Sequence, residues 1–125
     1  MSDDCPIRID VETDYLEAES SPEEAHFVFA YTITIHNDGP LAARLLSRYW
    51  RITDGHGRVR EVHGDGVVGE QPCLQPGTGF RYRSGAQLET PHGTMCGHYG
   101  LIDANGVSFD APIPEFLLTV PRVLH

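Results

Sequence analysis

The glycine-rich run GDGVVG, residues 64–69, is the stretch of this chain best suited to binding a ligand. Consecutive backbone N–H groups in such a loop can form a concave nest for an anion. Arginine side chains add planar, bidentate contacts to phosphate or carboxylate. The alternative is structural, because glycines adopt backbone conformations that side chains forbid. The candidate ligand-binding residues are Gly64, Asp65, Gly66, Gly69, Arg48, Arg81 and Arg83.

The same run matches the pattern G-x-G-x-x-G, but its surroundings exclude a Rossmann dinucleotide site. That use of the motif needs a helix directly after the glycines, whose N-terminus holds the pyrophosphate. Here Pro72 and Pro76 follow within a few residues and would interrupt a regular helix. An anion at this loop would therefore be bound without help from a helix.

Groups that could support catalysis are scattered along the chain. Seven histidines are present, with no H-E-x-x-H motif and no G-x-S-x-G nucleophile elbow. His56 and His63 flank one expected strand, and His92 and His98 flank another. Two of these histidines could meet across strands and bind a metal with Asp65. No acid–base pair is evident. We therefore predict a protein that is not an enzyme, with no catalytic residues, no metal site and no cofactor.

The elements that must position these groups are short strands. Residues 26–36 give the longest signal, because aromatic and β-branched side chains alternate there with a period of two. Alternation also predicts strands over 7–12, 45–53, 58–63, 80–84, 95–101, 107–111 and 116–120, separated by turns such as DGHG and DANG. No stretch has the period and length of a helix. The sequence therefore predicts an all-β fold, a single-domain antiparallel β-sandwich, with Trp50 as the largest inward side chain and Arg48 on the same face.

Composition narrows the classes of partner and compartment. The formal net charge of −9 comes from 18 acidic residues against nine basic ones, all of them arginine, and argues against a nucleic-acid-binding protein. The sequence has no long apolar run and no signal-peptide pattern, so we expect a cytoplasmic protein with no membrane partner. The cysteines are expected to be free thiols, with Cys73 and Cys96 packed as small hydrophobic side chains.

Several motifs resemble the bacterial ApaG (CorD) family. They are LLxRxWxIxD from Leu45 to Asp54, VxGxGVVGEQPxLxPGxxFxYxSG from Val62 to Gly85, IPxF at 113–116 and the closing Leu124-His125. The match spans nearly the whole chain, and GVVGEQP together with IPxF is specific. The glycine loop does not depart from the family pattern, whereas the acidic residues 1–24 are the least family-like part.

The resemblance implies a fibronectin type III-like or immunoglobulin-like sandwich, with residues 1–125 as one ApaG domain. It also implies an unsettled role. The family name is tied to cobalt and magnesium tolerance, and the bacterial genes lie beside those for diadenosine tetraphosphate hydrolysis and an rRNA adenine dimethyltransferase. Related domains close a eukaryotic F-box protein and a DNA-polymerase-interacting protein, where they look like protein-interaction modules.

Two hypotheses about function follow. The first, which we favour, is a non-catalytic module that binds a protein partner through a sheet face or an edge strand. The second is a small-ligand sensor that binds pyrophosphate or a dinucleoside polyphosphate at Gly64–Gly69, the family's suggested pyrophosphate-type loop. Mg²⁺ would then bind through the phosphates and one carboxylate such as Asp65.

Overall fold

The computed structural model describes residues 5–121; Leu124-His125 of the family match lies outside them. The described residues form two 3₁₀ turns, η1 (Glu17–Glu19) and η2 (Pro22–Glu24), and eight strands. The strands are β1 (Ile7–Tyr15), β2 (Phe27–Asn37), β3 (Ala43–Asp54), β4 (Val59–Asp65), β5 (Cys73–Leu74), β6 (Gly79–Leu88), β7 (His92–Asp103) and β8 (Ser108–Thr119). None of the helical segments described is long and apolar enough to cross a membrane.

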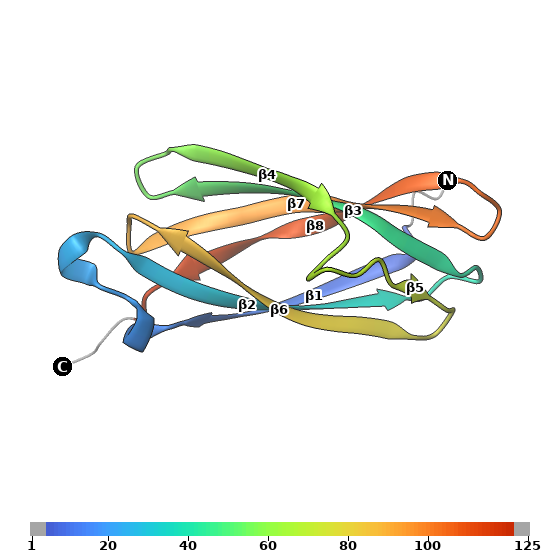
Figure 1. Ribbon diagram of the computed structural model, residues 1–125, viewed down its shortest axis with the longest axis horizontal. Helices are drawn as coiled ribbons and strands as arrows, with labels where there is room; N and C mark the ends of the chain where they lie inside the picture. The colour runs from blue at the N-terminus through green and yellow to red at the C-terminus, as the bar shows by residue number, and fades with distance from the viewer. Residues whose placement is uncertain (1–4, 122–125) are drawn as a thin grey trace.

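The strands form two antiparallel sheets that pack face to face (Figure 1). One sheet has the order β1-β2-β6, and the other has the order β4-β3-β7-β8, with β5 paired to the start of β3. This arrangement confirms the all-β sandwich that strand alternation predicted. The strand predicted over 7–12 lies at an edge, since β1 pairs with β2 alone.

The core lies between the sheets and is built from the inward residues of every long strand. Trp50 is 2% exposed and makes edge-to-face contacts with Tyr31 and Phe116, at ring-centroid distances of 5.3 and 5.9 Å. Aromatic pairs in this geometry add stability beyond the area they bury. The predicted inward position of Trp50 is therefore confirmed.

Two expectations about local structure are wrong. The two strands predicted over 107–111 and 116–120 are replaced by one continuous strand, β8 (Ser108–Thr119), which runs through Pro112 and Pro114. An edge strand accepts proline because it needs ladder hydrogen bonds on only one side. Cys73 is exposed and Cys96 only half-buried, so neither is a core side chain. Alternation alone could not show that Cys73 lies in the two-residue strand β5.

The two long sides of the sandwich differ. The edge strands β1 and β8 pack closely against each other on one side. The remaining edge strands, β4 and β6, make no contact of similar extent across the other side. We call this second side, between β4 and β6, the open side.

Candidate functional site

Arg48 is the residue around which the glycine run is arranged. The pairing of β3 with β7 shifts in register between Leu45 and Ser47. Such a bulge changes the face of the sheet to which the side chains after it point. Arg48 pairs with Gly64 of β4. Its Nη1 donates hydrogen bonds to the carbonyl oxygens of Asp65 (2.9 Å) and Gly66 (3.0 Å). The sequence predicted that Arg48 would help this loop to bind an anion. In the structure, the loop carbonyls instead bind the Arg48 guanidinium itself.

The packing explains two of the glycines. A Cβ on Gly64 would lie 2.5 Å from Cζ of Arg48, so the guanidinium at the end of that flexible side chain would have to move. A Cβ on Gly66 would lie 2.1 Å from the carbonyl oxygen of Glu70, and the φ angle of Gly66 is +61°. The backbone therefore requires glycine at position 66, whereas Gly64 leaves room for the guanidinium of Arg48.

Most of the backbone N–H groups of the loop are already used. The N–H of Gly66 donates to the carbonyl of Leu46 at 2.8 Å. Val67 and Glu70 exchange two hydrogen bonds, at 2.8 and 2.9 Å, across a tight turn. Within this turn only the amides of Val68 and Gly69, both at positive φ, lack a backbone acceptor among the described residues. The loop thus directs two carbonyl oxygens at the Arg48 guanidinium. Only the amides of Val68 and Gly69 remain available in this turn to bind an anion.

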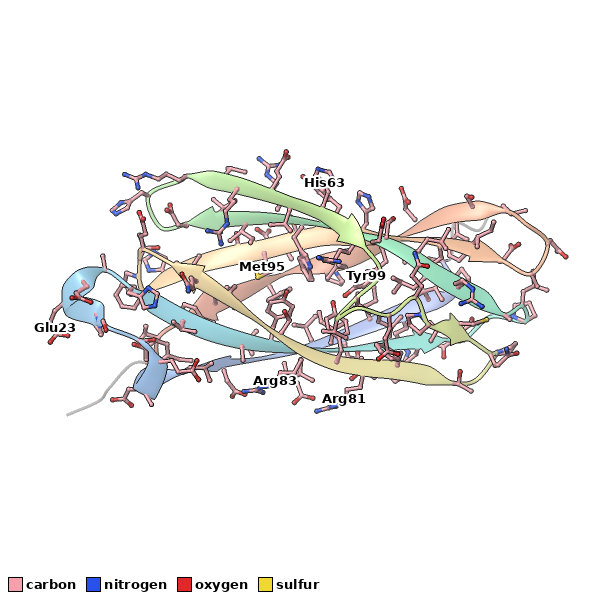
Figure 2. The ribbon with its side chains drawn as sticks, in the orientation of Figure 1. Glu23, His63, Arg81, Arg83, Met95 and Tyr99 are labelled. Atoms are coloured by element: carbon pink, nitrogen blue, oxygen red, sulfur yellow. The ribbon has the colours of Figure 1, made fainter. Side chains whose placement is uncertain are left out.

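Arg81 and Arg83 do not close this loop, contrary to the sequence-based expectation. They lie on the outer face of β6, in the other sheet, and Figure 2 shows them on the opposite surface from His63. Arg81 pairs with Glu12 at 3.7 Å, and Arg83 pairs with Asp14 at 3.2 Å. Exposed ion pairs of this kind add at most about 1 kcal/mol each. The alternation of β6 assigned them to one face but could not show which sheet they would join.

A hollow of about 500 Å³ lies on the open side, and we call it the edge groove. Its lining includes inward residues of β3, β4, β2 and β7 together with residues 84–87 of β6. The lining residues are Val28, Tyr31, Arg48, Trp50, Ile52, Arg60, Val62, Ser84, Gly85, Ala86, Gln87 and Met95. Figure 2 shows Met95 between the two sheets. The edge groove therefore combines an apolar floor with arginine and hydroxyl groups at its rim.

The electrostatic character of the edge groove is opposite to that of the whole chain. Arg48 and Arg60 line it, and none of its lining residues, all in the described part of the chain, is acidic. Within residues 5–121 neither arginine forms an ion pair with a carboxylate, whereas Arg8, Arg58, Arg81 and Arg83 all do. The groove is thus a cationic feature of an acidic protein.

A second feature, missed from sequence, lies on the outer face of the larger sheet. The ring of Tyr49 lies between those of His63 and His98 in tilted contacts, with centroids 4.9 and 5.0 Å away. The Tyr49 hydroxyl donates to Glu61 at 2.8 Å, which raises the Tyr49 pKa. No cluster of three metal-binding side chains occurs in the described part of the chain. Alternation predicts that Tyr49, His63 and His98 lie on outer faces. Only the strand register shows that both histidines lie directly beside Tyr49.

The buried hydroxyls of Tyr82 and Tyr99 hydrogen-bond to one another in the core between the two sheets. Burial raises the pKa of both phenols, and for Tyr99 the neighbouring Tyr82 adds to the shift. Both therefore stay neutral at physiological pH and act as a structural pair.

Comparison with known proteins gives a consistent result. Residues 17–103 match the ApaG domain family. The chain is 60% identical to Protein ApaG of Azoarcus sp., with all of both chains covered. It is 53% identical to Protein ApaG of Stenotrophomonas maltophilia, with 95% of this chain and 94% of the relative covered.

Solved structures agree. A crystal structure described as the ApaA protein of Bordetella pertussis superimposes with a TM-score of 0.91 at 49% identity, covering 94% of this chain and 95% of that one. The C-terminal domain of wzt shares the fold alone, with a TM-score of 0.55 at 9% identity over 97% of this chain and 77% of that one.

Proposed function

The chain belongs to the ApaG domain family, and from this premise we propose that it is a non-catalytic binding module whose ligand is a protein. One observation carries the proposal: the sandwich has an open side, where the edge strand β6 borders a cationic groove with an apolar floor. An edge strand presents unpaired backbone groups that can pair with another chain. Sandwich domains use such edges to recognise partners.

The state of the glycine loop supports the same proposal. The backbone requires glycine at position 66, Gly64 leaves room for the Arg48 guanidinium, and the loop carbonyls accept hydrogen bonds from Arg48. The glycine pattern therefore does not require a phosphate ligand to account for it. The surface with spare binding capacity is the open side.

The experiment is affinity capture with the full chain from cytosol of the native cell, followed by purification of any retained protein and calorimetric titration. We expect a protein that binds with one-to-one stoichiometry and saturates. An unrelated sandwich domain serves as the control. The proposal would be contradicted if the full chain retained only the proteins that this control also retains.

A second candidate function remains: binding of pyrophosphate or a dinucleoside polyphosphate at Gly64–Gly69, linked to cobalt and magnesium tolerance. The observation that favours it is the pair of amides of Val68 and Gly69, which lack backbone acceptors among the described residues, in the same loop whose Gly66 carbonyl accepts a hydrogen bond from Arg48. Mg²⁺ would be bridged by the phosphates and the Asp65 carboxylate.

The test of this alternative is an amide chemical-shift titration with pyrophosphate and diadenosine tetraphosphate, with and without Mg²⁺, at fixed ionic strength. Saturable shifts at Val68, Gly69 and Arg48 would establish it. Flat spectra at millimolar ligand would exclude it.

A further inference from the structure

We propose that the edge groove binds an extended segment of the partner protein, added as a new strand on β6. The segment places an acidic side chain on Arg48 or Arg60 and apolar side chains on the floor around Trp50 and Met95. This inference rests on the proposed function, since it specifies where the partner binds and which chemistry the partner presents.

The edge of β6 that does not pair with β2 is oriented for such pairing, and an incoming strand takes over the Gln87 carbonyl that Arg60 contacts. Nη2 of Arg60 donates to the backbone carbonyl of Gln87 at 3.2 Å, so this carbonyl points away from β2 and across the open side. In an antiparallel strand, backbone groups that face one side recur at every second residue. The N–H and C=O groups of Gly85 and Gln87 therefore face the open side together. Both residues line the edge groove.

The arginines specify the sign of the ligand. Arg48 is held in place through Nη1, which donates to two loop carbonyls. Arg48 and Arg60 have no carboxylate partner within the described residues, and no acidic residue among them lines the edge groove. A carboxylate can accept a charge-assisted, bidentate hydrogen bond from a guanidinium. An acidic side chain on the incoming strand supplies the missing anion.

The floor specifies the rest of the ligand. The lining side chains of Trp50, Ile52, Val62 and Met95 are apolar. Side chains of a strand point alternately to its two faces. A strand lying along β6 therefore directs every second side chain toward the edge groove. These groove-facing residues are expected to be apolar over the floor and acidic beside Arg48 or Arg60. Proline is excluded where its missing N–H would be needed.

The probe is a phage-displayed library of random linear twelve-residue peptides, selected on the full chain and then synthesised for titration. Trp50 is the single tryptophan of the chain and lies beneath the edge groove, so a change in its fluorescence is one readout of binding. We expect enriched peptides with an acidic residue among alternating apolar residues, and amide shifts concentrated at residues 84–88. No enrichment, enrichment without an acidic preference, or shifts confined to other surfaces would overturn the proposal.

Two variants at one position separate strand pairing from other kinds of binding. Gly85→Pro removes an N–H that faces the open side, so the pairing of β6 with β2 is preserved and the fold is expected to be retained. Gly85→Ala keeps that N–H, and its Cβ would meet only the carbonyl oxygen of Phe29, at 3.5 Å. We expect peptide affinity to fall about tenfold or more in Gly85→Pro and to stay within about twofold in Gly85→Ala. Equal affinity of both variants would refute strand addition.

The charge requirement is tested in parallel. Arg60→Gln is expected to weaken binding of acidic peptides about tenfold, whereas Arg51→Gln, on the outer face of β3, leaves it unchanged. Equal effects of the two substitutions would contradict an anion site in the edge groove. A protein captured by the full chain that still binds Gly85→Pro and Arg60→Gln with full affinity would refute this inference and leave the proposed function standing.

Discussion

Substitution of Gly64 by alanine tests whether the glycine run serves the fold. The new Cβ would lie 2.5 Å from Cζ of Arg48 and 2.6 Å from both of its Nη atoms, so the guanidinium has to move. It then loses its hydrogen bonds to the carbonyls of Asp65 and Gly66. Hydrogen bonds from a charged donor are worth about 1.5–3 kcal/mol each.

The net effect is smaller than the sum of these two bonds. The displaced guanidinium regains part of its hydration, and replacing glycine by alanine within a strand returns about 0.5–1 kcal/mol. Because the guanidinium is partly exposed and can move, we expect Gly64→Ala to lower the free energy of unfolding by about 1–2 kcal/mol. The assay is urea unfolding followed by Trp50 fluorescence and circular dichroism.

A double-mutant cycle isolates the cause. When Arg48→Ala is already present, Gly64→Ala is expected to be neutral or to stabilise by about 0.5 kcal/mol, because the clash is gone. The matched control is Gly69→Ala, whose Cβ would have open space but whose φ is +81°, so that it costs about 1–2 kcal/mol with or without Arg48. An equal cost of Gly64→Ala in both backgrounds would refute the reasoning.

Three further predictions concern stability. Trp50→Ala is expected to cost about 3–5 kcal/mol in urea unfolding, because it empties a buried aromatic site; a loss below about 1 kcal/mol would place Trp50 outside the core. Val68 is a β-branched residue at φ +43° and 53% exposed, so Val68→Asn is expected to stabilise by about 1 kcal/mol, and no gain in urea midpoint would contradict the strain. Burial raises the pKa of Tyr82 and Tyr99 in the folded state, so the unfolded chain ionises first. Stability is therefore full below about pH 10 and falls as the pH rises further, by up to about 1.4 kcal/mol per unit for each tyrosine; unfolding curves that do not change between pH 9 and 11 would contradict this.

Strand alternation predicted most of the fold because one-sided burial imposes a period of two on every strand. It placed Trp50 and Arg48 on one face, and the structure confirms that Trp50 lies in the core, with Arg48 lining the edge groove on the same side. Alternation failed where pairing partners decide the outcome. It broke β8 at Pro112, since the tolerance of an edge strand for proline depends on which of its sides is paired.

The candidate site was predicted less well, and the reason is register. Arg81 and Arg83 follow the glycine loop closely in sequence, yet β6 joins the sheet opposite β4, which carries them away from the loop. Arg60 and Gln87 are far apart in sequence and meet across the open side. No local pattern encodes that meeting, because it depends on how the two sheets stack.

The most direct test of the central claim, that this chain binds a protein at its open side, is site-specific photo-crosslinking in the native cell. A photoreactive residue is placed at Val62, whose side chain lines the edge groove from β4, or, in a second full-length chain, at Arg81 on the outer face of the smaller sheet. The account predicts one discrete protein adduct from position 62, absent from position 81 and lost when Gly85→Pro is added. Absence of any adduct from position 62, or the same adducts from both positions, would contradict it.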